Sequence, residues 1–120
     1  SGTAITTRAR NAGLEVAHAG EVNDLAVAGN EVAQKIMAEA KEHLANMIAT
    51  IIAITDPEII ILGGSVAMKI NGFAEDIQEL VKARVFAPVA PYVDIRRSTL
   101  SEDSGLIGAG YLAFSKAAAK

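Results

Sequence analysis

The feature that most constrains this chain is an unbroken apolar, mostly β-branched run near its midpoint. Residues 59–62 read Ile-Ile-Ile-Leu, follow Pro57 and end at Gly63-Gly64. Apolar and polar residues do not alternate here, and such a run is typical of a strand that is buried on both faces of a parallel sheet. The run therefore predicts an α/β fold in which helices flank the strand.

The rest of the pattern predicts helices and one further strand. From residue 32 to residue 52, apolar residues recur every three or four positions, which is the helical period, and Asn30 can cap this long helix. Asp56-Pro57 ends it, since a residue before proline avoids the helical region. We also expect a helix over about 73–86, capped by Asn71, a strand over 92–97, and helices over 1–10, 21–28 and about 105–118.

Two parallel strands joined by a right-handed crossover are the expected core of the arrangement. A pair this small leaves an exposed sheet edge, so we expect the missing neighbours to come from a partner or from sequence before Ser1. The first residue is Ser and no signal-peptide pattern follows it, which indicates a chain cut from something longer, or processed. The 120 residues leave room for one domain at most.

Composition excludes several classes of protein. With no Cys the chain is not a disulfide scaffold, and with net charge -3 and no long basic run it is not a nucleic-acid binder held by bulk charge. No apolar stretch approaches the roughly 20 residues of a membrane span. We expect a cytoplasmic protein. The mean hydropathy of +0.30 has two open interpretations, apolar surface meant for a partner or Ala richness alone.

Gly63-Gly64 is the first candidate site. The pair lies at the carboxyl end of the predicted buried strand, where open α/β sheets bind ligands, and glycine lets a ligand approach the backbone closely. A tight turn without a ligand is the alternative. A second glycine group, Gly105, Gly108 and Gly110, has the reverse order of the dinucleotide fingerprint and lies in a helical pattern. It predicts close packing of that helix on the sheet.

The histidines and Ser65 carry no recognisable site. His18 and His43 are far apart in the sequence, without a Cys or an H-x-x-x-H spacing, so no metal site is expected and both are read as surface or boundary residues. Ser65 lacks the G-x-S-x-G surroundings of a nucleophile.

Two charged pairs are also ambiguous. Glu102-Asp103 precede the last predicted helix, where carboxylates more often interact with the positive helix end than catalyse. Arg96-Arg97 end a predicted strand, either as a solvated edge or as an anion site. No catalytic residue is assigned.

Several segments form one larger pattern: Ser1-Gly2-Thr3-Ala4, Gly29-Asn30-Glu31-x-Ala33, the long helix, Asp56-Pro57-Glu58-Ile59-Ile60-Ile61-Leu62-Gly63-Gly64-Ser65-Val66, and Ser104-Gly105-Leu106-Ile107-Gly108-Ala109. Together they resemble the C-terminal part of ROK-family proteins, which include glucokinases, other sugar kinases and sugar-responsive repressors. The opening segment resembles the Ser-Gly stretch that follows the family's zinc-binding motif. The resemblance covers essentially the whole chain.

The resemblance implies an actin-like ATPase (ribonuclease H-like) fold with two domains flanking a cleft. Carried over residue by residue, it assigns Gly63, Gly64, Ser65 and Val66 to the adenosine part of ATP, with Ser65 in place of the usual third glycine. The family's phosphate motifs, catalytic Asp and zinc cluster should lie N-terminal to residue 1. Residues 1–120 are thus expected to be one C-terminal subdomain fragment, incomplete on its own.

The implied function is the adenosine-binding part of an ATP-dependent, glucokinase-like sugar kinase. The parent would bind ATP with Mg²⁺ and a hexose, and an upstream Asp would deprotonate the sugar hydroxyl. The chain alone should not phosphorylate sugar. Two alternatives stay open: part of a ROK-type repressor, or a self-associating structural chain without activity. We expect a homo-oligomer formed through exposed apolar surface, and neither a membrane nor a nucleic acid as partner of this segment.

Overall fold

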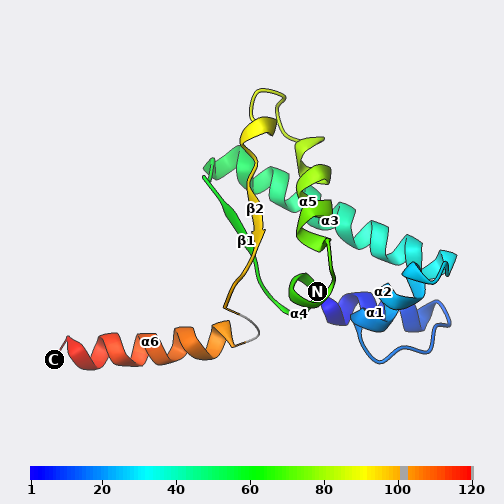
Figure 1. Ribbon diagram of the computed structural model, residues 1–120, viewed down its shortest axis with the longest axis horizontal. Coiled ribbons are helices and arrows are strands. Elements are labelled where there is room, and N and C mark those ends of the chain that lie inside the picture. The colour runs from blue at the N-terminus through cyan, green and yellow to red at the C-terminus, as the bar shows by residue number, and fades with distance from the viewer. Residues whose placement is uncertain (101–102, 120) are drawn as a thin grey trace.

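The computed structural model describes residues 1–100 and 103–119 and shows an α/β arrangement (Figure 1). In chain order its elements are α1 (Gly2–Asn11), α2 (Ala19–Val27), α3 (Glu31–Thr55), β1 (Ile60–Leu62), α4 (Ser65–Lys69), α5 (Phe73–Lys82), the 3-10 helix η1 (Ala90–Tyr92), β2 (Ile95–Arg97) and α6 (Ser104–Ala118). The strands β1 and β2 pair in parallel, with Ile60 opposite Ile95. The predicted pair of parallel strands with flanking helices is confirmed.

Helix ends follow from local capping. The Asn30 side chain accepts a hydrogen bond of 2.9 Å from Ala33 N at the start of α3, and Ser1 caps α1 by accepting from Ala4 N at 3.4 Å. At the other end of α3, Asp56 adopts the left-handed conformation and Pro57 follows it. The long helix and both of its predicted ends are therefore confirmed.

The segment after Gly64 differs from its prediction. A short helix, α4, precedes α5, and α5 ends at Lys82 where the sequence predicted a helix to about residue 86. Gly72, with a positive φ of 74°, is the N-cap of α5, so the predicted cap at Asn71 is wrong. The second strand begins at Ile95 and not at Tyr92, because residues 90–92 form η1, in which Pro91 has no N–H to give to a ladder.

The core lies between the long helix and the elements that pack along it. In Figure 1, α3 crosses the body diagonally, with α1 and α2 near its first half and α5 near its second. Helix α5 also contacts β2, where the Gln78 Oε1 atom accepts a hydrogen bond of 2.9 Å from Ile95 N. The largest fully buried side chains belong to these helices and are Ile48, Ile77, Val22 and Val81. Burial of this apolar stripe stabilises α3 more than its local propensity does.

The other face of the sheet is open in the described residues, contrary to the prediction of a strand buried on both sides. Ile60 and Leu62 are half-buried, but Ile61 between them is 54% exposed and stands opposite the exposed Arg96. No helix within residues 1–100 and 103–119 covers that face. The apolar run 59–62 is typical of a strand covered on both faces, and the described residues leave one of these faces uncovered.

Helix α6 projects away from the body (Figure 1). None of its described residues is buried, and nothing lies within 4 Å of a Cβ added to Gly105, Gly108 or Gly110. The predicted packing of these glycines on the sheet is therefore wrong, because α6 extends away from the strands.

Candidate functional site

The Gly63-Gly64 turn joins the carboxyl end of β1 to α4. Gly64 has φ 88° and ψ 162°, a conformation that is essentially restricted to glycine, and it is the N-cap of α4. A Cβ added to either glycine would meet no atom within 4 Å, and both residues are exposed. The turn thus offers bare backbone at a strand end, which is the arrangement that the sequence predicted for a ligand site.

A hollow of about 440 Å³, here called the polar hollow, is lined in part by Ser65 and Val66, the two residues that follow this turn, but by neither glycine. Its lining comes from α1, from the start of α2 with the loop before it, and from α4: Gly2, Thr3, Thr6, Thr7, Arg10, Ala17, His18, Ala19, Gly20, Ser65, Val66, Lys69 and Ile70. Among the described residues, the lining combines hydroxyl groups, two cations and a few apolar side chains, and includes no carboxylate. It is suited to a neutral or anionic polar ligand that also carries an apolar surface.

Two of the predicted site residues, Ser65 and Val66, lie in this lining, next to the first turn of α1. A Cβ added to Gly2 would lie 3.3 Å from Val66 Cγ2, so the absence of a side chain at Gly2 brings the two helices together. The buried Thr6 hydroxyl donates a hydrogen bond of 2.9 Å to Gly2 O and holds that turn of α1. The start of α1 therefore lines the candidate site, a juxtaposition that sequence spacing alone does not show.

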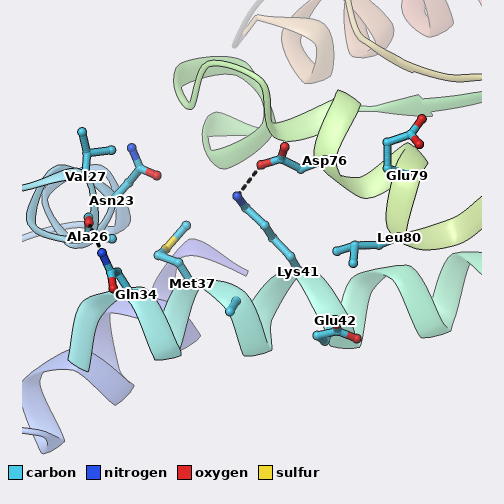
Figure 2. Close-up of a pocket in the computed structure, with 11 residues that line it drawn as sticks. Asn23, Ala26, Val27, Gln34, Met37, Lys41, Glu42, Asp76, Glu79 and Leu80 are labelled. Atoms are coloured by element: carbon cyan, nitrogen blue, oxygen red, sulfur yellow. Dashed lines mark hydrogen bonds and ion pairs between the residues drawn. The ribbon is translucent and has the colours of Figure 1, made fainter. Parts of the chain in front are cut away.

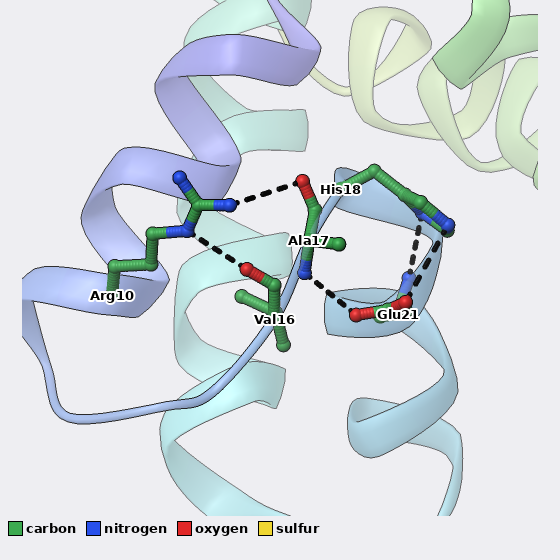
Figure 3. A network of polar contacts seen from close by, with 5 residues as sticks. All are labelled: Arg10, Val16, Ala17, His18 and Glu21. Atoms are coloured by element: carbon green, nitrogen blue, oxygen red, sulfur yellow. Dashed lines mark hydrogen bonds and ion pairs between the residues drawn. The ribbon is translucent and has the colours of Figure 1, made fainter.

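The loop wall of the polar hollow is held by a network that links α1 to α2 (Figure 3). Arg10 Nε donates to Val16 O at 2.8 Å, and Arg10 Nη2 donates to Ala17 O at 3.3 Å. From the other side, Ala17 N donates to Glu21 Oε2 at 2.7 Å. The His18 side chain caps α2, since its Nδ1 accepts from Glu21 N at 3.3 Å. The sequence analysis missed this cap, because histidine is not among the Ser, Thr, Asp and Asn residues that usually occupy the N-cap.

A second hollow of about 560 Å³, the apolar hollow, has Gly63 of the turn in its lining. It is lined mainly by α1, α3 and the end of β1, and includes Leu44, Met47, Leu62, Gly63, Val66 and the exposed His43. In the described residues β1 pairs with β2 alone, so its other edge is unpaired. The apolar hollow has the character of a packing surface, whereas the polar hollow offers hydrogen-bonding groups.

A third hollow, of about 540 Å³, lies between α2, α3 and α5 (Figure 2). Figure 2 shows Lys41 reaching across it to Asp76, with 2.5 Å between Lys41 Nζ and Asp76 Oδ2. Gln34 Nε2 donates to Ala26 O at 3.0 Å on the same surface. These contacts tie the three helices together, and the other two charged residues of the lining have partners outside it, Glu42 with Arg84 and Glu79 with Lys82.

The remaining candidate site residues either have partners within the fold or lie outside the described residues. Arg96 donates to both carboxylate oxygens of Asp94, at 2.9 and 2.6 Å, and this hydrogen bonding raises the pKa of Arg96. Arg97 Nη1 donates to Met68 O at 3.2 Å. Asp103 is the N-cap residue of α6, and Glu102 lies outside the described residues. Across residues 1–100 and 103–119, no three His, Asp or Glu side chains are grouped closely enough to hold a metal ion.

With this geometry described, the chain can be compared with known proteins. Residues 1–116 match the model of a protein family that is described as the ROK family. The bifunctional enzyme NanE/NanK of Brucella melitensis biotype 1 is 37% identical over an alignment of 103 residues that covers 83% of this chain and 19% of that protein. The N-acetylmannosamine kinase of Escherichia coli O1:K1 / APEC is 36% identical over 114 residues, 94% of this chain and 37% of that protein. The chain therefore spans well under half of either relative.

A solved structure shows the fold. The ROK hexokinase from Thermus thermophilus superposes with a TM-score of 0.76 and 24% identity, over 97% of this chain and 40% of that one. The predicted actin-like ATPase class is confirmed, and the described elements correspond to part of that fold. In the described residues, no helix has both the length and the apolar character needed to cross a membrane.

Proposed function

The chain belongs to the ROK family, and on that premise we propose that it is the adenosine-binding part of an ATP-dependent sugar kinase. The observation that carries the proposal is the polar hollow, whose lining includes Ser65 and Val66, the two residues that follow the bare Gly63-Gly64 turn. Relatives named as an N-acetylmannosamine kinase and a ROK hexokinase support the kinase assignment. A ROK-type repressor is the alternative, and a turn open to a nucleotide favours the kinase.

In this proposal each predicted site residue has a distinct part. Gly63 and Gly64 let adenosine pass against the backbone, because neither carries a Cβ that would hold the ligand away. The exposed Ser65 presents a hydroxyl at the rim of the hollow, and Val66 gives the flat base an apolar contact. Hydroxyls of α1, such as that of Thr3, face the same space and supply hydrogen-bonding groups for the ribose or the base edge.

Phosphoryl transfer also needs positioned phosphates, Mg²⁺ and a base near the sugar hydroxyl. We assign none of these groups to the described residues. The proposal treats residues 1–120 as one C-terminal subdomain of a longer kinase, whose other part would hold the Mg²⁺-bound phosphates and the hexose. It retains the cytoplasmic location expected from the sequence. Accordingly, the purified chain should not convert ATP to ADP when any hexose is added.

Photolabelling tests where the nucleotide binds. We expect 8-azidoadenosine triphosphate to label peptides of α4 or the first half of α1, and excess ATP should prevent that labelling. Excess hexose, as the matched competitor, should leave it unchanged. Labelling that ATP does not prevent, or labelling confined to α5 or α6, would contradict the proposal.

We further propose that a second copy of the chain covers the apolar surface that the described fold leaves open. The accessible surface is 7927 Å². This is about 1,700 Å² more than the roughly 6,200 Å² expected for a compact protein of 12.5 kDa. A standard interface buries about 800 Å² per partner, so the excess is large enough for a stable dimer. The exposed large side chains of α6 are Leu106, Ile107, Tyr111, Leu112 and Phe114.

Light scattering across a concentration series tests this self-association. We expect a dimer or larger assembly that dissociates when Leu106 and Phe114 are both replaced by Asp. The matched control replaces Val27 and Phe86 by Asp in the same way. Both are exposed on other parts of the body, and this variant should leave the assembly intact. A monomer at every concentration would contradict the proposal.

A further inference from the structure

We propose that Arg10 and Glu21 are positioning residues for the nucleotide: they fix residues 16–18 as a wall of the polar hollow and thereby set its affinity. This inference rests on the proposed function, since it requires a nucleotide in that hollow. Neither residue was singled out by the sequence pattern, and both are located by the contacts in Figure 3.

The two side chains form hydrogen bonds with a single residue of the loop, one with its carbonyl oxygen and one with its N–H. Arg10 Nη2, from the last turn of α1, binds the carbonyl oxygen of Ala17 at 3.3 Å. The Glu21 carboxylate, from the first turn of α2, accepts from the N–H of the same residue at 2.7 Å. Arg10 Nε also binds the preceding carbonyl, that of Val16, at 2.8 Å. Figure 3 shows the loop held between the two helices by these contacts.

Side-chain contacts matter here because regular structure does not hold this loop. Residue 17 lies between α1 and α2, outside both helices. Within residues 1–100 and 103–119, no backbone–backbone hydrogen bond involves Ala17. Its backbone N–H and C=O groups are therefore fixed by Arg10 and Glu21. Removal of these two side chains leaves the wall free to move.

The fixed loop lines the same hollow as the residues that follow the turn. Ala17 and His18 line the polar hollow together with Ser65 and Val66, and Arg10 itself contributes to the lining. A loop that is already in place does not have to be ordered when the ligand binds, which favours affinity. Because the contacts to Ala17 are near the solvent, their loss should affect the global stability much less than the shape of the wall.

An amide NMR titration of the full chain with ATP tests the inference. We expect the signals of residues 63–66 and 17–20 to shift together. Arg10→Ala and Glu21→Ala should each weaken binding about tenfold, a difference that corresponds to about 1.4 kcal/mol. Glu21→Gln, which keeps an oxygen acceptor for Ala17 N, should restore most of the affinity.

The matched control is Arg84→Ala. Arg84 also donates to a backbone oxygen, that of Leu80, and to Asn46 Oδ1 at 2.7 Å, but it joins α5 to α3 away from the polar hollow. We expect it to change the melting temperature and not the affinity for ATP. Should Arg10→Ala fail to fold, the comparison of Glu21→Ala with Glu21→Gln gives the same answer.

The outcomes separate the two proposals. If residues 63–66 shift while residues 17–20 do not, and the Arg10 and Glu21 variants bind as the wild type does, this inference is overturned and the proposed function stands. If no signal shifts in any form of the chain, both are overturned. If Glu21→Gln binds as poorly as Glu21→Ala, the positioning role of Glu21 is rejected.

Discussion

Gly2 and Val66 meet where two helices of different parts of the chain converge. A Cβ on Gly2 would lie 3.3 Å from Val66 Cγ2, tighter than most side-chain contacts, so the first turn of α1 sits directly against the first turn of α4. The polar hollow opens along this junction. The identity of residue 2 therefore affects the shape of a site whose recognised motif lies more than half the chain away.

Replacing Gly2 by Leu should weaken nucleotide binding at least about tenfold, since the added side chain pushes against Val66 and enters the hollow. Calorimetric titration with ATP measures the change. Gly105→Leu is the control, because it also lies at the start of a helix and a Cβ there meets nothing within 4 Å. Wild-type affinity in Gly2→Leu would show that the nucleotide does not use this side of the turn.

Local signals predicted much of the fold correctly. Asn30 and Asp56-Pro57 bounded the long helix because capping and the restriction before proline act within a few residues. The Gly63-Gly64 turn was located in the same way. What failed depended on distant contacts: the apolar run predicted a strand covered on both faces, and Ile61 is 54% exposed in the described structure.

The candidate site was predicted only in part for the same reason. Its glycine turn is a local motif, whereas the contribution of α1 depends on how Gly2 meets Val66 in the folded chain. The role of Arg10 depends on the path of the loop after α1, which no periodicity encodes. The start of α2 was missed because its cap, His18, is not one of the usual capping residue types.

Acid should remove one link between α1 and α3. The side-chain hydrogen bond from Arg8 lowers the pKa of Glu39 below its ordinary value of 4.5. A carboxylate whose pKa is lowered on folding stabilises the protein above its unfolded pKa, and that contribution disappears as the pH falls through the folded pKa. Urea unfolding should therefore show Glu39→Gln to be less stable than the wild type at neutral pH and equally stable in strong acid.

The exposed Glu15 provides the control for this experiment. Glu15→Gln should track the wild type at both pH values, because no hydrogen bond or ion pair to Glu15 is present in residues 1–100 and 103–119. A difference between Glu39→Gln and the wild type that persists unchanged into strong acid would reject the electrostatic explanation.

Replacing Asp56 should stabilise the chain. Asp56 has a φ of 43° at the end of α3, a left-handed conformation that glycine adopts without strain, and its negative charge lies at the negative end of the helix. We expect Asp56→Gly to raise the free energy of unfolding by about 1 kcal/mol. Asp56→Asn should gain less, through the loss of the charge.

Asp56→Ala separates the two effects, since it removes the charge and keeps the backbone strain. Denaturant unfolding should place it below Asp56→Gly. Equal stability of the Ala and Gly variants would show that the left-handed conformation is not the source of the gain.

We place the nucleotide beside Gly64, and calorimetric titration of the chain with ATP and ADP in the presence of Mg²⁺ is the decisive test of that assignment. Gly64→Val is compared with Gly29→Val, because Gly29 also has a positive φ, of 96°, with open space around it, and lies in the turn between α2 and α3. Circular dichroism first establishes that both variants are folded. We predict a Kd of about 1 mM or tighter that is lost in Gly64→Val and kept in Gly29→Val. Absence of saturable binding to the wild-type chain, or undiminished binding to Gly64→Val, would contradict the account.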